Sequence, residues 1–428
     1  MVIGIRREDK NIWERRVPLI PADLADLQAQ GVRFRVQPSP NRVFTDQQYR
    51  DAGVEVAEDL GPCDLVLAVK EVPTELLEPG KAYVYFAHVI KGQDYNMPML
   101  QRLLDLGCSL VDYEKICDES GRRLIFFSLH AGHAGMIDTL WALGRRLAAR
   151  GVATPLADLK QTYEYGSFAD ALDHVRSVGA RLDAELPADL RPLTIGVAGY
   201  GNVARGCRDV LDALGTEWVE ADGLAAAAVR DPQAPPVRCV EFREEHLVRP
   251  VEGQPFDRQD YFDNPGRYEA AFEPRLDHLD VLMNTIYWEP RYPRLVTRQW
   301  ARDHRDARLE AIGDISCDIE GSVEITLKAT MPDAPCFTWD PDTDTAVDGV
   351  DGPGPVIMAV DNLPCEVPRE SSAHFSGVLR AMAPALAACD WSAPYEALDL
   401  PPELKGALIT HRGELTPPYT YLRDHLGA

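Results

Sequence analysis

Short apolar runs and amphipathic stretches alternate along residues 1–130, which is the pattern of a parallel α/β sheet. The apolar runs predict strands at Val2–Arg6, Arg33–Gln37, Leu65–Val69, Ala82–Ala87 and Ser109–Asp112. The amphipathic stretches predict helices at Pro21–Gln30, Thr45–Ala52 and Met97–Leu106. Apolar residues then recur at helical spacing through Leu129–Arg150, where we expect a long helix that could link two domains.

The second half of the chain returns to the strand pattern, with strands predicted at Val281–Ile286, Ala311–Ile315 and Val356–Val360. Residues 222–274 are rich in Pro, Asp, Glu and Arg, and we expect an irregular insertion there. Residues 333–354 are predicted to form an acidic loop. Their aspartates lack the glycine and the terminal glutamate of a calcium-binding EF-hand, which favours a solvated loop over a Ca²⁺ site. The tail from Ser371 is predicted to be helical and then proline-rich.

A Gly-x-Gly-x-x-Ala pattern follows the apolar run that begins at Leu193, and an amphipathic stretch follows the pattern. In such a turn Gly199 permits the tight bend, Gly201 lets the backbone approach a pyrophosphate, and the small Ala204 lets helix and strand pack closely. The helix N-terminus supplies oriented N–H donors for the anion. A strand before the turn and a helix after it favour a dinucleotide site over an ordinary glycine turn.

Glu220 ends a predicted strand, Trp218–Glu220, about twenty residues beyond the glycine motif. An acid at that spacing binds the adenosine ribose hydroxyls of NAD and repels the additional phosphate of NADP. A solvated strand end is an equally good interpretation of this residue.

Length and composition exclude several classes of protein. A chain of 428 residues with 45% hydrophobic residues is long enough to fill two cores, and its net charge of −24 argues against nucleic acid and anionic membrane surfaces as partners. No apolar run reaches the length of about 18 residues that a membrane span needs, and the N-terminus lacks the plan of a signal peptide. The nine cysteines form no Cys-x-x-Cys pair, so we expect reduced thiols in a cytoplasmic protein, with neither disulfides nor a metal site.

Two residues at predicted strand ends are candidates for proton transfer. Lys70 follows the run that ends at Val69, and His88 follows the run that ends at Ala87. Open α/β sheets bind ligands at the carboxyl ends of their strands, where a partly dehydrated lysine has a lowered pKa and a histidine needs little tuning. A solvated loop lysine and a hydrogen-bonded strand-end histidine are the structural alternatives. Because both residues follow adjacent predicted strands, the catalytic and the structural interpretations of the pair are about equally favoured.

Arginines are clustered around the same predicted edge. Arg6, Arg7, Arg15 and Arg16 lie in the first loop, and Arg122 and Arg123 follow a predicted turn. A guanidinium binds a carboxylate through two parallel hydrogen bonds, which suits amino-acid or oxo-acid substrates. Surface arginines are common in this chain, so by themselves they favour no site.

Several separate blocks together resemble the lysine–ketoglutarate reductases, the saccharopine-forming members of the saccharopine dehydrogenase/alanine dehydrogenase superfamily. These blocks lie at residues 5–10, 13–21, 69–73, 86–91, 112–115, 121–123, 131–136, 199–203, 284–288, 314–318, 321–322, 361–364, 407–410, 413–415 and 419–422. The resemblance runs from end to end and is weakest at residues 222–274. It implies two Rossmann-like, doubly wound parallel-sheet α/β domains with a cleft between them.

The resemblance also implies the domain organisation. A discontinuous substrate domain would comprise residues 1–131 plus 367–428, and a dinucleotide-binding domain would comprise residues 132–366.

The resemblance assigns roles to individual residues. Lys70 and His88 correspond to an acid–base pair, and Arg6 and Arg123 to carboxylate-binding arginines. Glu114 corresponds to a glutamate that tunes the lysine, and Asp361 to an aspartate beside the nicotinamide. The full set of expected site residues is Lys70 and His88 for catalysis, Arg6, Glu71, Glu114 and Arg123 for the substrate, and Gly199, Gly201, Asn202, Val203, Glu220, Ile286 and Asp361 for the cofactor.

The implied reaction is the NADPH-dependent condensation of L-lysine, or a related amine, with 2-oxoglutarate to saccharopine through an imine. Because the chain ends at residue 428, we expect the second enzyme of the bifunctional relatives to be absent. Glu220 alone would favour NAD, whereas the resemblance favours NADP, and the oligomeric state stays open. The alternatives are an alanine dehydrogenase that uses ammonia and pyruvate, and a nucleotide-binding regulatory protein without catalysis.

Overall fold

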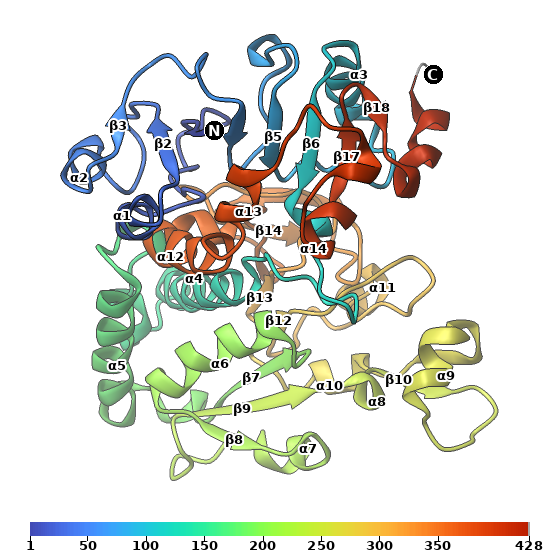
Figure 1. Cartoon of the computed structure of the whole chain (residues 1–428). Coiled ribbons are helices and arrows are strands. Elements are labelled where there is room, and N and C mark those ends of the chain that lie inside the picture. The colour runs from blue at the N-terminus through green and yellow to red at the C-terminus, as the bar shows by residue number, and fades with distance from the viewer. Residues whose placement is uncertain (427–428) are drawn as a thin grey trace. The chain divides into compact units, whose positions relative to one another are not determined.

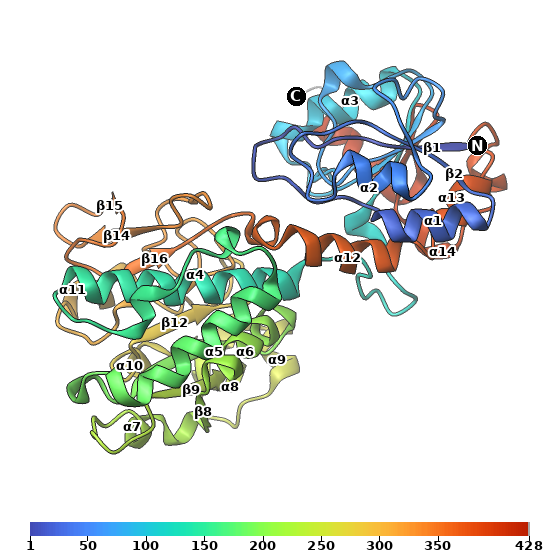
Figure 2. The same cartoon turned by 90° about the vertical axis from the view of Figure 1, so that its left-hand side faces the viewer.

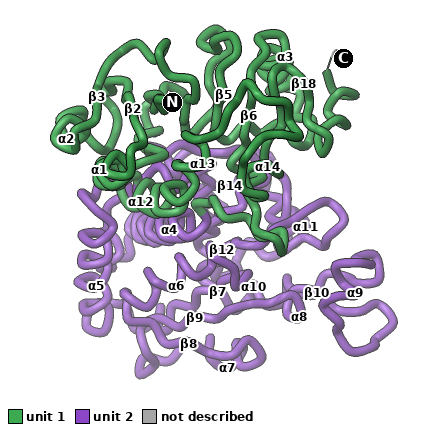
Figure 3. The backbone as a smooth tube through the Cα atoms, viewed as in Figure 1, with its two compact units in different colours: residues 1–127, 368–428 green, residues 128–367 purple. Residues whose placement is uncertain are grey.

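A computed structural model describes residues 1–426 of the chain. Contacts within the chain divide it into two compact units, Met1–Phe127 with Pro368–Ala428, and Ser128–Val367 (Figure 3). Each unit is built around its own sheet of eight strands, so the expected α/β class with two mainly parallel sheets is confirmed. Among residues 1–426, no helix combines the length and the apolar character needed to cross a membrane.

The first unit contains a sheet in which the C-terminal strands lie beside a strand from the first half of the chain (Figure 1). Its order is β18 (Glu414–Leu415), β17 (Leu408–His411), β6 (Ser109–Asp112), β5 (Ala82–Tyr85), β4 (Leu65–Leu67), β1 (Val2–Ile5), β2 (Arg33–Val36) and β3 (Glu55–Val56). The strands from β6 to β3 are parallel, whereas β17 runs antiparallel to β6 and to β18. Its helices are α1 (Pro21–Ala29), α2 (Asp46–Asp51), α3 (Met97–Asp105), α12 (Pro368–Leu379), α13 (Ala383–Ala388) and α14 (Pro402–Gly406).

The second unit contains the other large sheet and a small ribbon. The sheet order is β15 (Thr345–Asp348), β14 (Cys336–Asp340), β16 (Val356–Met358), β13 (Ala311–Asp314), β12 (Val281–Asn284), β7 (Leu193–Ala198), β9 (Val237–Phe242) and β8 (Glu217–Val219). The strands from β16 to β8 are parallel, and β14 is antiparallel to both of its neighbours. The ribbon pairs β10 (Val248–Pro250) with β11 (Tyr268–Ala270).

Alternate residues of the strands in the second sheet supply two separate apolar layers. One layer packs against α4 (Ser128–Ala149), α5 (Phe168–Glu185) and α6 (Asn202–Leu214), which lie side by side in Figure 2. The opposite layer packs against shorter elements, which are α7 (Leu224–Ala227), α8 (Glu244–Leu247), α9 (Arg258–Asp263), α10 (Glu273–Leu276) and α11 (Arg298–Asp303). Such two-sided burial explains why the strands are nearly continuous apolar runs in the sequence.

Two expectations from the sequence are wrong in this unit. The segment expected to be an irregular insertion contains β9, which lies inside the large sheet between β7 and β8. The segment expected to be an acidic loop forms the hairpin of β14 and β15. β9 and β14 have apolar residues that pack into the core, whereas β15 is largely exposed and pairs with β14 at the edge of the sheet. The surrounding prolines and charged residues make this strand pattern hard to recognise from composition.

Helices α4 and α6 cross at glycines, which lets their backbones touch. A Cβ atom at Gly206 would lie 2.2 Å from the carbonyl oxygen of Leu129, and one at Gly132 would lie 2.0 Å from that of Val203. The close crossing fixes the position of the helix that follows the glycine turn.

A buried pair of carboxyl groups lies between α4 and the short turn that follows β16. Asp138 on α4 accepts hydrogen bonds from the backbone and the hydroxyl of Thr162, at 2.8 Å and 2.9 Å, and its other neighbour is Glu366. Burial raises the pKa of Asp138 to about 6. Burial and the charge of Asp138 raise the pKa of Glu366 well above its usual range.

Exchanging Glu366 for glutamine is expected to stabilise the protein relative to the unaltered chain, by an amount that increases as the pH rises. A carboxyl with a raised pKa in the folded state contributes stability that is present below its unfolded-state pKa and is lost as the pH rises through the folded-state pKa. Glutamine has no proton to lose. Urea denaturation near pH 8 should therefore give a free energy of unfolding about 1–3 kcal/mol above that of the unaltered chain, a difference that closes toward pH 4. The exposed Glu396→Gln control should show no pH-dependent difference, and equal curves for Glu366→Gln would contradict the raised pKa of Glu366.

Candidate active site

The first sheet has a topological switch point between β1 and β4, where the strand order reverses. Ligands of open α/β sheets bind at the carboxyl ends of the strands beside such a point. Arg6 directly follows β1, and its backbone N–H donates to the carbonyl of Leu67, the last residue of β4, at 2.9 Å. Lys70 lies three residues beyond Leu67, so the structure brings Arg6 and Lys70 to the expected edge.

Lys70 is half-buried, and its ammonium makes no hydrogen bond or ion pair with any residue of 1–426. Burial lowers the pKa of Lys70, and the charges of Arg16 and Lys10 lower it further against the opposing charges of Glu14 and Glu71. A lysine in this setting reaches its neutral form closer to neutral pH than a solvated one. It is therefore able to accept and return a proton.

Glu8 fixes the loop that carries Lys70. Its carboxylate accepts hydrogen bonds from the backbone N–H groups of Val69, at 2.7 Å, and of Lys70, at 3.1 Å. Burial and the charge of Glu14 raise the pKa of Glu8 to about 7, although these two hydrogen bonds act in the opposite direction. The sequence analysis did not identify Glu8, because a glutamate in a charged loop has no distinguishing local signal.

His88 follows β5, the neighbour of β4, and is held by Glu71. Its Nδ1 lies 2.6 Å from Oε1 of Glu71, whose other oxygen receives an ion pair from Lys10 at 3.1 Å. Burial acts to raise the pKa of Glu71, but the hydrogen bond to His88, a backbone hydrogen bond and the charge of Lys10 outweigh it, and the pKa lies well below its usual range. His88 has a φ of 50°, in the left-handed region. A residue other than glycine keeps this conformation only when the surrounding structure holds it there.

Asn96 supports this pair and was also missed in the sequence. Its buried amide donates to the carbonyl of Ala87 at 2.8 Å and lies 3.4 Å from Oε1 of Glu71. It therefore ties the strand end before His88 to the partner of His88. Only the folded chain brings residues 71, 88 and 96 together.

Two of the arginines near the candidate site, Arg16 and Arg123, lie on aromatic rings. Arg16 is buried in an ion pair with Glu14, with Nη2 2.5 Å from the carboxylate, and its guanidinium lies 4.3 Å from the centre of the Phe127 ring. Arg123 lies 5.2 Å from the centre of the Phe86 ring. These rings belong to a cluster in which Phe86, Tyr113, Phe127 and Phe375 contact one another. Stacking on aromatic faces restrains a guanidinium while leaving its edge available for a carboxylate.

The other expected substrate residues have partners within the unit. Arg6 is buried and forms an ion pair with Asp9. Arg123 lies 4.0 Å from Glu114, and its Nε donates to the carbonyl of Ile125 at 2.8 Å. Glu114 is therefore the partner of Arg123, whereas the carboxylates whose charges act most on Lys70 are those of Glu14 and Glu71.

The second sheet has its own switch point, between β7 and β12, and the glycine turn lies there. Gly199 has a φ of 115°, and a Cβ atom at this position would lie 2.5 Å from Oγ1 of Thr285, the residue after β12. Gly201 precedes α6 with a φ of −78°, and a Cβ atom there would meet nothing within 4 Å. No side chain caps α6, whose first residues are Asn202 and Val203. An open approach and unsatisfied N–H groups fit a bound pyrophosphate.

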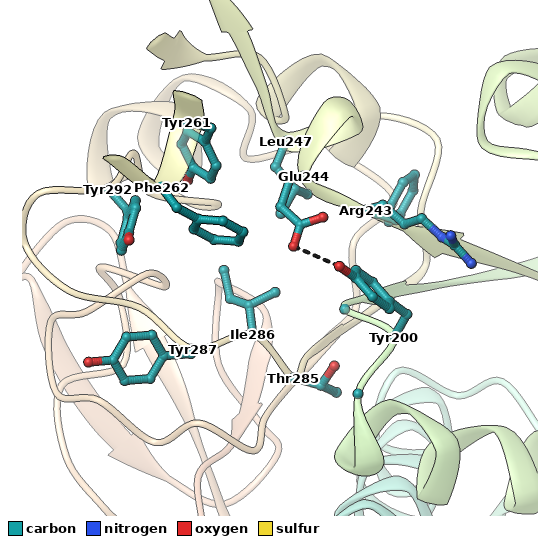
Figure 4. Close-up of a pocket in the computed structure, with 13 residues that line it drawn as sticks. Tyr200, Arg243, Glu244, Leu247, Tyr261, Phe262, Thr285, Ile286, Tyr287 and Tyr292 are labelled. Atoms are coloured by element: carbon teal, nitrogen blue, oxygen red, sulfur yellow. Dashed lines mark hydrogen bonds between the residues drawn. The ribbon is translucent and has the colours of Figure 1, made fainter. Parts of the chain in front are cut away.

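A cavity of about 260 Å³ opens beside the glycine turn (Figure 4). Its lining residues are Gly199, Tyr200, Gly201, Phe242, Arg243, Glu244, Leu247, Tyr261, Phe262, Thr285, Ile286, Tyr287 and Tyr292. In Figure 4 the rings of Tyr261, Phe262 and Tyr292 gather on one side and Tyr200 lies opposite, with Ile286 between them. Aromatic and apolar walls of this kind fit a planar heterocycle such as adenine. Gly199, Gly201 and Ile286 of the expected cofactor residues thus share one cavity.

Glu220 and Asp361 lie outside this cavity. Glu220 is exposed and follows the edge strand β8, with β9 between it and β7. Asp361 is exposed beyond the carboxyl end of β16. The structure therefore does not bring these two residues to the lining that Gly199 and Ile286 share.

Two motifs that the sequence analysis assigned to the family form a buried network at the ends of β12 and β13. The amide of Asn284 donates to Asp314 at 2.8 Å and to Ser322 at 2.7 Å, and the hydroxyl of Thr326 donates to Asp314 at 2.6 Å. Burial raises the pKa of Asp314 to about 6. These residues position the loop after β12, which carries Thr285 and Ile286.

The first part of the chain is similar to a known family. Residues 4–134 match the model described as alanine dehydrogenase/PNT, N-terminal domain.

The whole chain is homologous to part of a larger enzyme. It is 36% identical over 442 residues to alpha-aminoadipic semialdehyde synthase of Arabidopsis thaliana, with 98% of this chain and 41% of that protein covered. It is 34% identical over 440 residues to the mitochondrial alpha-aminoadipic semialdehyde synthase of Mus musculus, with 99% and 47% covered. The chain spans less than half the length of these relatives.

More distant relatives match this chain at nearly their full length. Saccharopine dehydrogenase [NAD(+), L-lysine-forming] of Neurospora crassa is 25% identical over 395 residues, with 88% of each chain covered. Among solved structures, an L-alanine dehydrogenase superposes with a TM-score of 0.63 at 18% identity and covers 99% of both chains. A transhydrogenase from Sinorhizobium meliloti gives a TM-score of 0.58 at 15% identity, with 97% and 100% covered. Both structures share the fold.

Proposed function

We propose that the chain is an oxidoreductase that condenses L-lysine, or a related amine, with 2-oxoglutarate and reduces the product to saccharopine with NAD(P)H. The observation that carries the proposal is the unpartnered, partly buried ammonium of Lys70 at one switch point, beside the strand that leads to His88. The end-to-end homology with alpha-aminoadipic semialdehyde synthase and the printed name of the Neurospora crassa relative support it.

The second unit supports a nicotinamide dinucleotide as cofactor. Enzymes of the alanine dehydrogenase/PNT family use such a cofactor. Gly199, Gly201 and the N-terminus of α6 would hold the pyrophosphate, and the aromatic cavity would hold the adenine. When bound, the cofactor supplies hydride to the carbon of the imine.

The residues of the first unit supply binding and proton transfer. Arg6 and Arg123 would bind the carboxylates of the oxo acid. The neutral amine attacks the carbonyl carbon, and one proton moves from its nitrogen to the new alkoxide to give the carbinolamine. A second proton then adds to this hydroxyl, which leaves as water as the protonated imine forms. Lys70, with its lowered pKa, takes the proton from the substrate ammonium and returns it to that oxygen, and His88 with Glu71 is the second proton-carrying pair.

The test is an assay of the purified chain with L-lysine, 2-oxoglutarate and NADPH or NADH, in which the loss of reduced-nicotinamide absorbance and the appearance of saccharopine by mass spectrometry are measured together. Both signals should require all three components. A panel of ornithine and other amines identifies the true donor. Oxidation with ammonia and pyruvate alone would favour an alanine dehydrogenase, and no oxidation with any amine and oxo-acid pair would contradict the enzymatic proposal.

A further inference from the structure

The spatial order of the strands that follow the glycine turn differs from their order along the sequence. After β7 and α6 the chain first forms β8, yet β8 lies at the edge of the sheet and β9 occupies the place beside β7. Strands are spaced by about 4.8 Å, so the end of β8 lies about 10 Å from the glycine turn in the plane of the sheet. The strand end that adjoins the turn is that of β9.

The register of β7 and β9 identifies the residue at this place. Ala198 pairs with Phe242, and the N–H of Gly199 donates to the carbonyl of Phe242 at 2.9 Å. The next residue is Arg243. In dinucleotide-binding domains this strand end carries an acid that binds the 2′-hydroxyl of NAD, or an arginine that accommodates the 2′-phosphate of NADP.

We propose that Arg243 is the residue that selects NADPH, by binding the phosphate on the 2′-oxygen of the adenosine ribose. The inference rests on the proposed function only in requiring that the second unit binds a nicotinamide dinucleotide. A guanidinium forms paired, charge-assisted hydrogen bonds with phosphate oxygens, which a ribose hydroxyl does not replace.

The surroundings of Arg243 fit this role. Its guanidinium lies 4.9 Å from the centre of the Tyr200 ring, and Figure 4 shows both side chains at the wall of the cavity beside the glycine turn. A second arginine, Arg258 at the start of α9, places Nη1 3.4 Å from the hydroxyl of Tyr200. Two cationic side chains therefore approach the same tyrosine, which favours binding of an anion beside it.

Two acidic side chains, Glu241 and Glu244, lie close to Arg243 and Tyr200. Nε and Nη2 of Arg243 each lie 3.0 Å from Oε1 of Glu241, but Arg243 is exposed, and an exposed ion pair of this kind is weak enough to exchange for a phosphate. Glu244 accepts a hydrogen bond from the hydroxyl of Tyr200 at 3.1 Å. Its carboxylate suits the ribose 3′-hydroxyl, which NAD and NADP share.

The experiment measures binding of NADPH and NADH to the full chain by nicotinamide fluorescence, without amine or oxo acid. The unaltered chain should bind NADPH at least tenfold more tightly than NADH. Arg243→Ser should weaken NADPH binding at least tenfold and change NADH binding less than twofold, and Arg243→Asp should reverse the preference. Thermal unfolding of each variant verifies that it is folded.

The matched control is Arg249→Ser, which removes an exposed arginine that pairs with Glu269 at 2.6 Å and does not line the cavity. It should leave both affinities unchanged. Tighter binding of NADH by the unaltered chain, equal losses for both cofactors in Arg243→Ser, or a change of preference in Glu220→Gln would each overturn the proposal. Binding is measured without turnover, so failure to convert lysine and 2-oxoglutarate would leave the proposal for Arg243 intact. If neither NADPH nor NADH binds, both proposals are contradicted.

Discussion

Replacing Lys70 by methionine is expected to reduce turnover by about 10²–10⁴-fold while leaving cofactor affinity unchanged. Methionine fills a similar volume but carries no proton, so the amine would lose its acid–base partner while the fold is kept. Lys70 belongs to the first unit, whereas the glycine turn and the aromatic cavity belong to the second. The measurements are steady-state kcat and NADPH binding on the same preparation.

The pH dependence provides an independent check on Lys70. Because burial lowers the pKa of this amine, kcat/KM in the condensation direction should rise with pH through that lowered pKa, as the neutral form becomes populated. This limb of the profile should be missing in Lys70→Met.

Lys91→Met serves as the control, because Lys91 is an exposed lysine of the loop that follows His88. It should retain full turnover and the complete pH profile. If Lys70→Met instead loses turnover and NADPH affinity in parallel, Lys70 has a structural role.

Replacing Gly201 by valine is expected to weaken binding of both NADPH and NADH at least tenfold in a protein that folds normally. The backbone at Gly201 has a φ that valine adopts, and a Cβ atom there meets no protein atom within 4 Å. The side chain would instead occupy the approach through which the pyrophosphate reaches the N–H groups of α6. Nicotinamide fluorescence titration and the melting temperature together separate loss of binding from loss of fold.

The chain offers a matched control in Gly223, which also has space for a Cβ atom and a negative φ, at −88°. Gly223→Val should bind both cofactors as the unaltered chain does. Normal affinity in Gly201→Val would contradict a pyrophosphate site at the turn.

The fold could be predicted where strands are buried on both faces. The run before Gly199 and those before Lys70 and His88 are continuous in apolar residues, and each is a central strand of its sheet. The predictions failed for β9 and for the hairpin of β14 and β15. Their strand pattern is interrupted by arginine, glutamate or aspartate and flanked by prolines, and it becomes decisive only when neighbouring strands supply the pairing.

The candidate site residues that directly follow strands could be predicted from the sequence. Lys70 and His88 were found because parallel strands bring their carboxyl ends to one edge, which a linear pattern reveals. Glu8 and Asn96 were not found, because their roles consist of hydrogen bonds to residues distant in the sequence. The role proposed for Arg243 was not predicted from the sequence, because the spacing that pointed to Glu220 assumes that consecutive strands are neighbours.

The exchanged order of β8 and β9 has a consequence for how this domain tolerates changes in length. Residues 215–236 connect α6 to β9. The one strand in this segment, β8, lies at the outer edge of the sheet. Lengthening or shortening this excursion leaves the neighbours β9, β7 and β12 in register. The three strands beside the cavity are therefore the same neighbours that a chain passing from α6 straight to β9, without β8, would have. Counted along that shorter chain, Arg243 would stand about twenty residues from the glycine turn, the distance at which Glu220 now stands.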